Sequence, residues 1–218
     1  MTGLGVVVMA TLERSEAALQ LSQRVGGEVA YDPGGSQPSA LRGHCAALRH
    51  ALDTYLGMSH ICVLQEDAIT CPHFTRVALD VAAAQPTSLV SLYLGSNHAA
   101  RSVYLRRLRS CQRFAKLPLN HFVPTVGIIW PVPYANAFLG WVHGQPDSPY
   151  DDEAIRLWRQ AAHKHGDTTP DAVASIPSIV NHDNRLPSVI GHRSHGARSA
   201  LCSWRSWNGY HDWRDGWQ

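Results

Sequence analysis

The chain has 218 residues, of which 44% are hydrophobic and 17% charged, and its formal net charge is +2. This length favours one domain with a sizeable core, and the composition excludes an intrinsically disordered chain. The longest apolar runs fall short of the roughly 20 residues of a membrane span, and the first residues lack a signal-peptide leader, so we expect a soluble, cytoplasmic protein. The five cysteines form no C-x-x-C pair, which favours neither a disulfide framework nor a thiolate zinc site.

Strands and helices are predicted to alternate along the first half of the chain. Short apolar runs bounded by turn residues predict strands, and apolar residues at helical spacing predict amphipathic helices. The predicted strands are residues 5–10, 28–31, a run from 61 to the acids at 66 and 67, and 88–94; the predicted helices are 13–25, 38–56 and 74–84. This alternation predicts an α/β fold with a mostly parallel central sheet flanked by helices, with ligands at the carboxyl ends of its strands.

The second half of the chain continues the pattern and then loses it. A strand at 125–130, a helix at 134–142 and a helix from about 148 to Gly166 are predicted. From residue 192 the chain is rich in tryptophan, histidine and arginine and has no usable periodicity. We therefore expect one domain over residues 1–191, followed by a tail over 192–218 that packs on the domain or contacts a partner.

One apolar stretch, Ile61–Ile69, delivers Glu66 and Asp67 to the end of a buried strand. Buried carboxylates without a partner are strongly disfavoured, so a cation is expected beside them. Carboxylate oxygens suit Mn²⁺ or Mg²⁺, which often take only one or two protein ligands. The alternative is a strand followed by a solvated turn.

Two further charge clusters stand out. Asp151, Asp152 and Glu153 open a helix, where acids stabilise the helix dipole, but three in succession exceed what a cap needs. The segment 101–116 carries six basic residues and no acid, which suits either phosphate binding or a solvated helix face. Neither a G-x-G-x-x-G nor a P-loop motif occurs, so a nucleotide would have to be held in another way.

The order of these motifs resembles that of the family 25 glycosyltransferases, the lipopolysaccharide and collagen galactosyltransferase group. The run Val63–Ala68 resembles the family's V-L-E-D-D-V segment, with Gln65 in place of the first acid. The other matching segments are Arg42–His50 (G-C-x-x-S-H helix), Thr125–Leu139, Tyr150–Glu153 (acidic helix start), and Pro177–Val180 with His182. The similarity covers most of residues 5–190, and compact proteins of this kind encoded by bacteriophages are also similar.

The resemblance implies a single GT-A-like (Rossmann-like) domain that transfers a sugar from a nucleotide-sugar donor, such as a UDP-sugar, with inversion and with Mn²⁺ or Mg²⁺. Asp67 is then the main metal ligand, and His182 completes the ligand set unless it is an ordinary hydrogen-bonding loop histidine. Asp152, or failing that Asp151, becomes the base that takes the acceptor hydroxyl's proton. The donor-binding residues implied are Thr11, Arg14, Asp32, Arg42 and Glu66.

The acceptor must be inferred from composition. Arg106, Arg107 and Arg109, together with the tryptophan-rich tail, have the charge and stacking character of a nucleic-acid surface. With the phage-like resemblance, this makes a hydroxymethylated pyrimidine in DNA a candidate acceptor; a protein or a glycan hydroxyl is the alternative. Two other functions stay open. A nucleotidyltransferase would usually carry a Gly-rich or lysine-bearing loop after the first strand, and a non-catalytic module binding nucleic acid or a capsid partner would explain Gln65.

Overall fold

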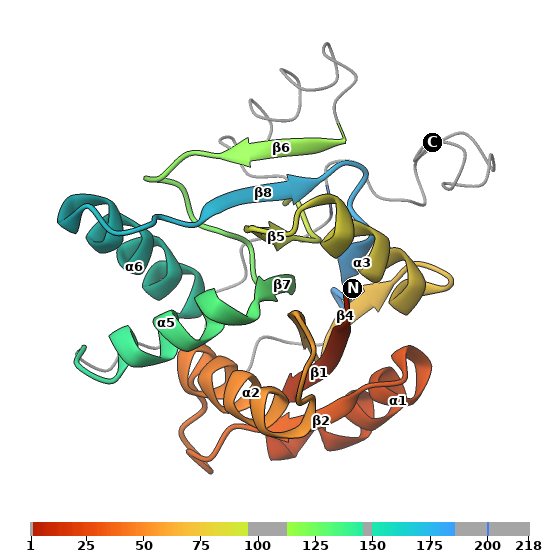
Figure 1. Ribbon diagram of the computed structural model, residues 1–218. Helices are drawn as coiled ribbons and strands as arrows, with labels where there is room; N and C mark the ends of the chain where they lie inside the picture. Colours follow the sequence, from red (N-terminus) through yellow and green to blue (C-terminus); the bar gives the residue numbers. More distant parts are fainter. Residues whose placement is uncertain (1, 96–112, 146–149, 186–199, 201–218) are drawn as a thin grey trace.

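The computed structural model describes residues 2–95, 113–145, 150–185 and 200. In this part of the chain, a seven-stranded sheet carries helices on both faces (Figure 1). The elements are β1 (Leu4–Ala10), the 3-10 helix η1 (Leu12–Arg14), α1 (Ser15–Val25), β2 (Glu28–Tyr31), α2 (Ala40–Thr54), β3 (His60–Gln65), β4 (Ala68–Thr70), α3 (Phe74–Ala84), β5 (Ser88–Ser91), β6 (Phe114–Leu117), β7 (Gly127–Pro131), α5 (Val132–Val142), α6 (Asp151–His165), β8 (Asp171–Ser175) and β9 (Val180–His182).

The strand order of the large sheet is β2-β1-β3-β7-β5-β8-β6. β1 pairs in parallel with β2 and β3, and β5 pairs in parallel with β8. The central strand β7 is antiparallel to both β3 and β5, and β6 is antiparallel to β8. The sheet is therefore mixed, and its parallel pairings are separated by the antiparallel β7. A second sheet of two antiparallel strands joins β4 to β9.

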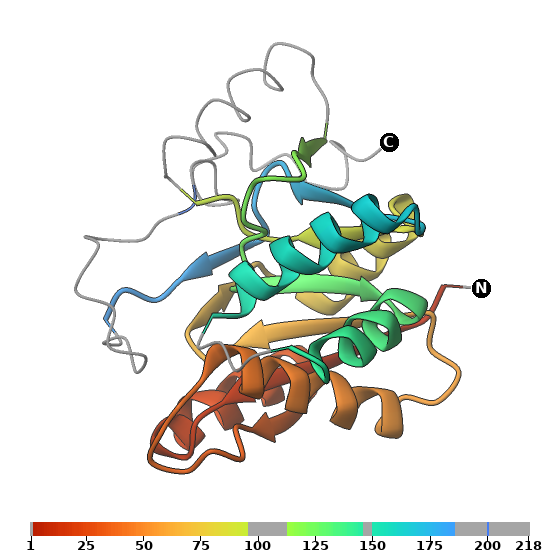
Figure 2. The same cartoon turned by 90° about the vertical axis from the view of Figure 1, so that its left-hand side faces the viewer.

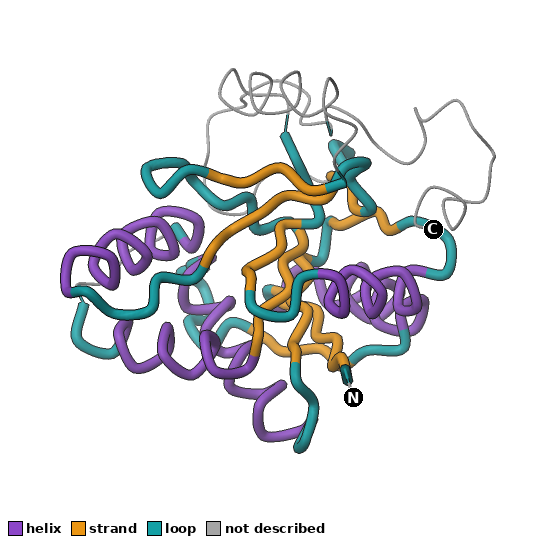
Figure 3. Tube along the Cα trace, turned by 45° about the horizontal axis from the view of Figure 1, so that its top comes forward, coloured by secondary structure: helices purple, strands orange, loops and turns teal. Residues whose placement is uncertain are grey.

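Alternating side chains send two apolar sets to opposite faces of the sheet, as the period of two in a strand requires. Val7 of β1 and Val63 of β3 contribute to the core under α2, α5 and α6. Val8 and Leu64, one residue further along, contribute to the core under α1 and α3. Figure 2 shows α2, α5 and α6 in front of the sheet, and Figure 3 shows the strands running between the two helical layers.

The structure confirms the α/β class and most predicted elements. β2 and α3 have the predicted bounds, and α1 and α6 end at Gly26 and Gly166 in the left-handed conformation that favours glycine at a helix C-terminus. The prediction did not include β8, or β6 within the basic segment. Because residues 114–117 form a strand, the helix-face interpretation is wrong for them. Among the described residues, no helix is long and apolar enough to cross a membrane.

Several predictions fall on residues outside the described part of the chain. These include Arg106, Arg107 and Arg109, the Ser148 helix start, and all of the tail except Ala200. Ala200 donates its backbone N–H to the side-chain oxygen of Asn181 in β9.

Candidate functional site

The predicted site residues come from one edge of the large sheet. The register pairs Met9 of β1 with Gln65 of β3, and Leu64 of β3 with Gly127 of β7. The carboxyl ends of β1 and β3 therefore meet the amino end of β7, because β7 runs in the opposite direction. This edge lies on the left in Figure 2, opposite the N-terminus. Residues that follow β1 and β3 and residues that precede β7 are thus neighbours.

Asp67 stands between a histidine and an arginine. Its Oδ2 lies 3.2 Å from Nε2 of His182 and 3.4 Å from Nη1 of Arg14, and the same Arg14 nitrogen lies 3.0 Å from Oε1 of Glu66. The β4–β9 pairing accounts for the first contact, since it places Ala68 opposite His182. The structure thus brings together four residues predicted from widely separated parts of the sequence: Arg14, Glu66, Asp67 and His182.

The surroundings of Glu66 disfavour its ionised form. Burial raises the pKa of Glu66 to about 7, and the neighbouring charge of Asp67 adds to this effect, although Arg14 opposes it. An additional cation at this position would favour the ionised form of Glu66.

The residues present fit a divalent cation that takes few protein ligands. The described part of the chain holds no group of three or more histidine, cysteine, aspartate or glutamate side chains placed to bind a metal. Asp67 and His182 nevertheless form a pair, and Asp67 Oδ1 is buried and accepts no hydrogen bond from a described residue. Mg²⁺ and Mn²⁺ commonly bind through one or two protein side chains and take the remaining ligands from water and substrate phosphates.

Asp32 and Arg42, two predicted donor-binding residues, are paired with each other. Arg42 Nε lies 2.6 Å and Nη2 3.1 Å from the two carboxylate oxygens of Asp32, which also accept the backbone N–H groups of Gly34 and Ser39. Burial raises the pKa of Asp32, but these hydrogen bonds outweigh burial and lower it. A Cβ at Gly34 would lie 1.5 Å from Nη2 of Arg42, so a side chain at this position would displace the guanidinium group from Asp32. The pair shapes the loop after β2.

Thr11, the remaining donor-binding candidate, follows β1 directly. Its hydroxyl is buried and has no hydrogen-bond partner among the described residues. Buried hydroxyl groups usually find a partner, so an unpaired one at a strand end is a position at which a ligand can bind. Of the five predicted donor-binding residues, Thr11, Arg14 and Glu66 lie along the ends of β1 and β3.

The two predicted bases have different surroundings. Asp151 is buried, and its carboxylate accepts hydrogen bonds from Thr125 Oγ1 at 3.1 Å and from the backbone of Asp152 at 2.9 Å; His44 Nδ1 lies 3.0 Å from its other oxygen. Asp152 is only partly buried, and its Oδ1 accepts the N–H of Glu153. Burial raises the pKa of Asp152 to about 6, and the charge of Asp151 adds to this rise.

These surroundings favour Asp152 as the proton acceptor. Both carboxylate oxygens of Asp151 accept hydrogen bonds, whereas in Asp152 only Oδ1 accepts one from a described residue and Oδ2 accepts none. A carboxylate whose pKa is near 6 is also a better base than one with an ordinary pKa, yet it remains mostly ionised at neutral pH.

Sequence reasoning did not assign roles to His44 and Thr125, which hold Asp151. His44 is fully buried on the face of α2 that also carries Leu41 and Leu48. A polar residue on an apolar helix face is the sequence signal that could have pointed to it. Thr125 carried no signal of its own, because it lies just before β7.

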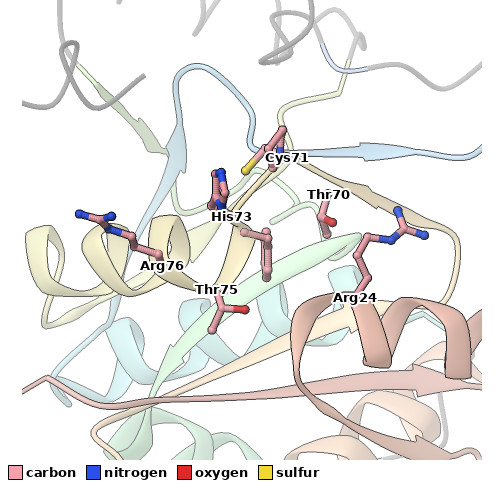
Figure 4. Close-up of a pocket in the computed structure, with 8 residues that line it drawn as sticks. Arg24, Thr70, Cys71, His73, Thr75 and Arg76 are labelled. Carbon is pink, nitrogen blue, oxygen red and sulfur yellow. The ribbon is translucent and has the colours of Figure 1, made fainter. Parts of the chain in front are cut away.

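A depression of about 530 Å³ lies elsewhere, between α1 and the start of α3, and is lined in part by Arg24, Thr70, His73 and Arg76. Figure 4 shows the guanidinium groups of Arg24 and Arg76 pointing away from each other. The depression therefore lacks a convergent set of charged groups, and none of the candidate site residues lines it.

Comparisons with known proteins add no assignment. No protein-family model matches the chain, and no curated protein matches it significantly.

Proposed function

We propose that this protein is a metal-dependent glycosyltransferase of the GT-A type that transfers a sugar from a nucleotide-sugar donor to an acceptor hydroxyl. The observation that carries the proposal is that the Asp67–His182 pair follows the end of β3, where Gln65 contacts Thr125 and Thr125 contacts Asp151, the neighbour of Asp152. The Asp67–His182 pair suits a cation that binds diphosphate, and the Asp152 carboxylate suits a base. The motif order that resembles family 25 enzymes supports the same chemistry.

The donor would lie along the ends of β1 and β3. Asp67 and His182 would hold Mn²⁺ or Mg²⁺, which when bound would neutralise the charge that develops on the departing diphosphate. Thr11 offers an unpaired buried hydroxyl beside this position. Arg14, which contacts both Glu66 and Asp67, would keep these carboxylates oriented.

Asp152 would act as the base. The acceptor hydroxyl oxygen would form a bond to the anomeric carbon, the bond from that carbon to the diphosphate oxygen would break, and the hydroxyl proton would pass to Asp152. The nucleoside diphosphate would leave with the electron pair of the broken bond. A single displacement of this kind inverts the configuration at the anomeric carbon.

The acceptor is proposed from the basic residues of the sequence. We propose a hydroxymethylated pyrimidine in DNA, in the cytoplasm of a phage-infected host, with a protein or a glycan hydroxyl as the alternative. The tryptophan-rich tail and the basic segment also suit a non-catalytic module, an alternative that Gln65 keeps open; Gln65 donates its side-chain amide to Thr125 at 3.2 Å and therefore has a local structural role.

Donor binding tests the proposal without requiring an acceptor. A panel of nucleotide sugars is screened by thermal shift with and without Mn²⁺; a donor at a hundred times its dissociation constant should stabilise the folded protein by about 2.7 kcal/mol. Asp67→Ala should remove the Mn²⁺-dependent part of this shift. Asp171→Ala is the matched control, because Asp171 is an exposed aspartate that pairs with Lys116 in β6. Absence of a shift for every donor, or an equal shift in the Asp67 variant, would contradict the proposal.

A further inference from the structure

A hydrogen-bonded chain of polar groups, all buried except the partly exposed Gln65, converges on Asp151. One arm runs from Trp130 in β7 through His44 in α2, with Trp130 Nε1 3.1 Å from His44 Nε2 and His44 Nδ1 3.0 Å from Asp151 Oδ2. The other arm runs from Gln65 at the end of β3 through Thr125, with distances of 3.2 Å and then 3.1 Å to Asp151 Oδ1. Four elements, β3, β7, α2 and α6, are thereby tied to one carboxylate.

The direction of the first arm is fixed by tryptophan chemistry. An indole N–H can only donate, so Nε2 of His44 must be the acceptor and the ring must be neutral, with its proton on Nδ1. Nδ1 then donates to Asp151. A protonated His44 would direct a second N–H at the indole N–H, which the 3.1 Å contact does not allow.

The direction of the second arm follows from the amide of Gln65. Its Nε2 donates to the Thr125 hydroxyl, which in turn directs its own proton to Asp151. A carboxylate at position 65 could not donate to Thr125; it would accept the hydroxyl proton of Thr125 and so remove a donor from Asp151. Gln65 is therefore the residue type that this arm requires, although the resembled family has an acid there.

Asp151 thus accepts three hydrogen bonds, from His44, from Thr125 and from the backbone N–H of Asp152. Hydrogen bonds to the charged form favour ionisation of a buried carboxyl group. The charged groups of α6 that face Asp152 are Asp151 and Glu153, and Glu153 is paired with Arg156 at 2.6 Å. Among the described residues, the groups that reach Asp151 from α2, β3 and the start of β7 are neutral.

We infer that Gln65, Thr125, His44 and Trp130 are positioning residues that fix the Asp151 carboxylate beside Asp152 as the acceptor of three hydrogen bonds, so that a proton entering the pair is taken up by Asp152. The inference rests on the proposed function for its catalytic meaning, but the proton assignment can be measured without any activity. In this arrangement, the carboxyl group of the pair that first takes up a proton is Asp152 and not Asp151.

Carbon-13 NMR titration of the aspartate carboxyl groups tests the inference, with the Asp152 signal assigned from Asp152→Asn. In the unaltered protein, the Asp152 signal should titrate near pH 6, in line with the raised pKa. Thr125→Val keeps the side-chain shape but removes the hydroxyl, so the proton should move to Asp151 and the Asp152 midpoint should fall measurably below pH 6. Thr125→Ser keeps the hydroxyl and should retain the original midpoint.

Gln65→Glu is the second variant, and it tests the direction of the arm at a partly exposed position. It should redirect the Thr125 proton and lower the Asp152 midpoint as Thr125→Val does. An Asp152 midpoint that stays near pH 6 in both variants would overturn the inference. If the protein transfers sugar, the acid limb of its pH–activity profile should move with the NMR midpoint. Movement of the midpoint in a protein without transferase activity would refute the proposed function and leave the proton assignment standing.

Discussion

Replacement of Asp152 by asparagine should make the protein more stable at high pH. Burial and the charge of Asp151 raise the pKa of Asp152 from its ordinary value of 3.8 to about 6. Between these values the folded protein binds a proton that the unfolded chain does not, so stability falls as the pH rises from about 4 to 6. At pH 8 the full cost applies, about 3 kcal/mol, since each tenfold change in an ionisation constant is worth about 1.4 kcal/mol.

Asparagine keeps the shape of the side chain and avoids this cost. The raised pKa already includes the favourable interaction of the charge with the N-terminus of α6, so we expect a gain of up to about 3 kcal/mol at pH 8. Urea unfolding at pH 8 and pH 4 measures the effect, and the gain should nearly vanish at pH 4. Asp171→Asn, at an exposed position, should change stability by less than about 0.5 kcal/mol. An Asp152→Asn protein that is no more stable than the original at pH 8 would refute the reasoning.

The remaining predictions concern activity. Asp67→Ala should abolish transfer and donor-linked Mn²⁺ binding while the far-ultraviolet circular dichroism spectrum stays unchanged, because Asp67 lies beyond the end of β3 rather than within it; full activity would show that the metal is held elsewhere. Asp152→Asn should keep donor binding but slow transfer by about 10²- to 10⁴-fold in a single-turnover assay, and an unchanged rate would place the base elsewhere. Replacement of Arg106, Arg107 and Arg109 together by alanine should flatten the salt dependence of DNA binding; salt-independent binding by the unaltered protein would favour a protein or glycan acceptor.

Local sequence patterns predicted the elements that are bounded by turn or helix-breaking residues next to them in the sequence. β2 and α3 have the predicted bounds because turn residues or a helix-breaking segment enclose each of them. β8 is a short alanine-containing strand that opens on a charged residue, and β6 lies among basic residues, so neither shows the apolar run that marks a buried strand. The antiparallel direction of β7 depends on its partners β3 and β5, which local periodicity does not specify.

The candidate site was predictable where a charge stood out against an apolar background. Glu66 and Asp67 interrupt an apolar run, and motif order linked them to His182. In the structure, Arg14 contacts both Glu66 and Asp67, and His182 contacts Asp67. The Asp32–Arg42 pair was predicted to contact the donor, but their contact with each other spans ten residues of loop and helix. Such side-chain pairing depends on the folded path of the chain and leaves no periodic signal.

The network around Asp151 shows the same limit at longer range. His44 and Asp151 are 107 positions apart, and Thr125 and Gln65 are 60 positions apart. Each residue taken alone has an ordinary interpretation as a core histidine, a helix-starting acid, a pre-strand threonine or a replaced family acid. The mixed sheet order places β7 beside β3 and so brings Thr125 to Gln65, and the packing of α2 beside α6 brings His44 to Asp151.

The most direct test of the central claim is release of nucleoside diphosphate from a panel of nucleotide sugars by the purified protein. Glycosyltransferases of this chemistry can transfer the sugar to water when the acceptor is absent, so the assay requires no knowledge of the acceptor. We predict Mn²⁺- or Mg²⁺-dependent release from at least one donor by the unaltered protein, and its loss in Asp67→Ala. No release from any donor with either metal, by protein that remains folded, would contradict the account and favour a binding module.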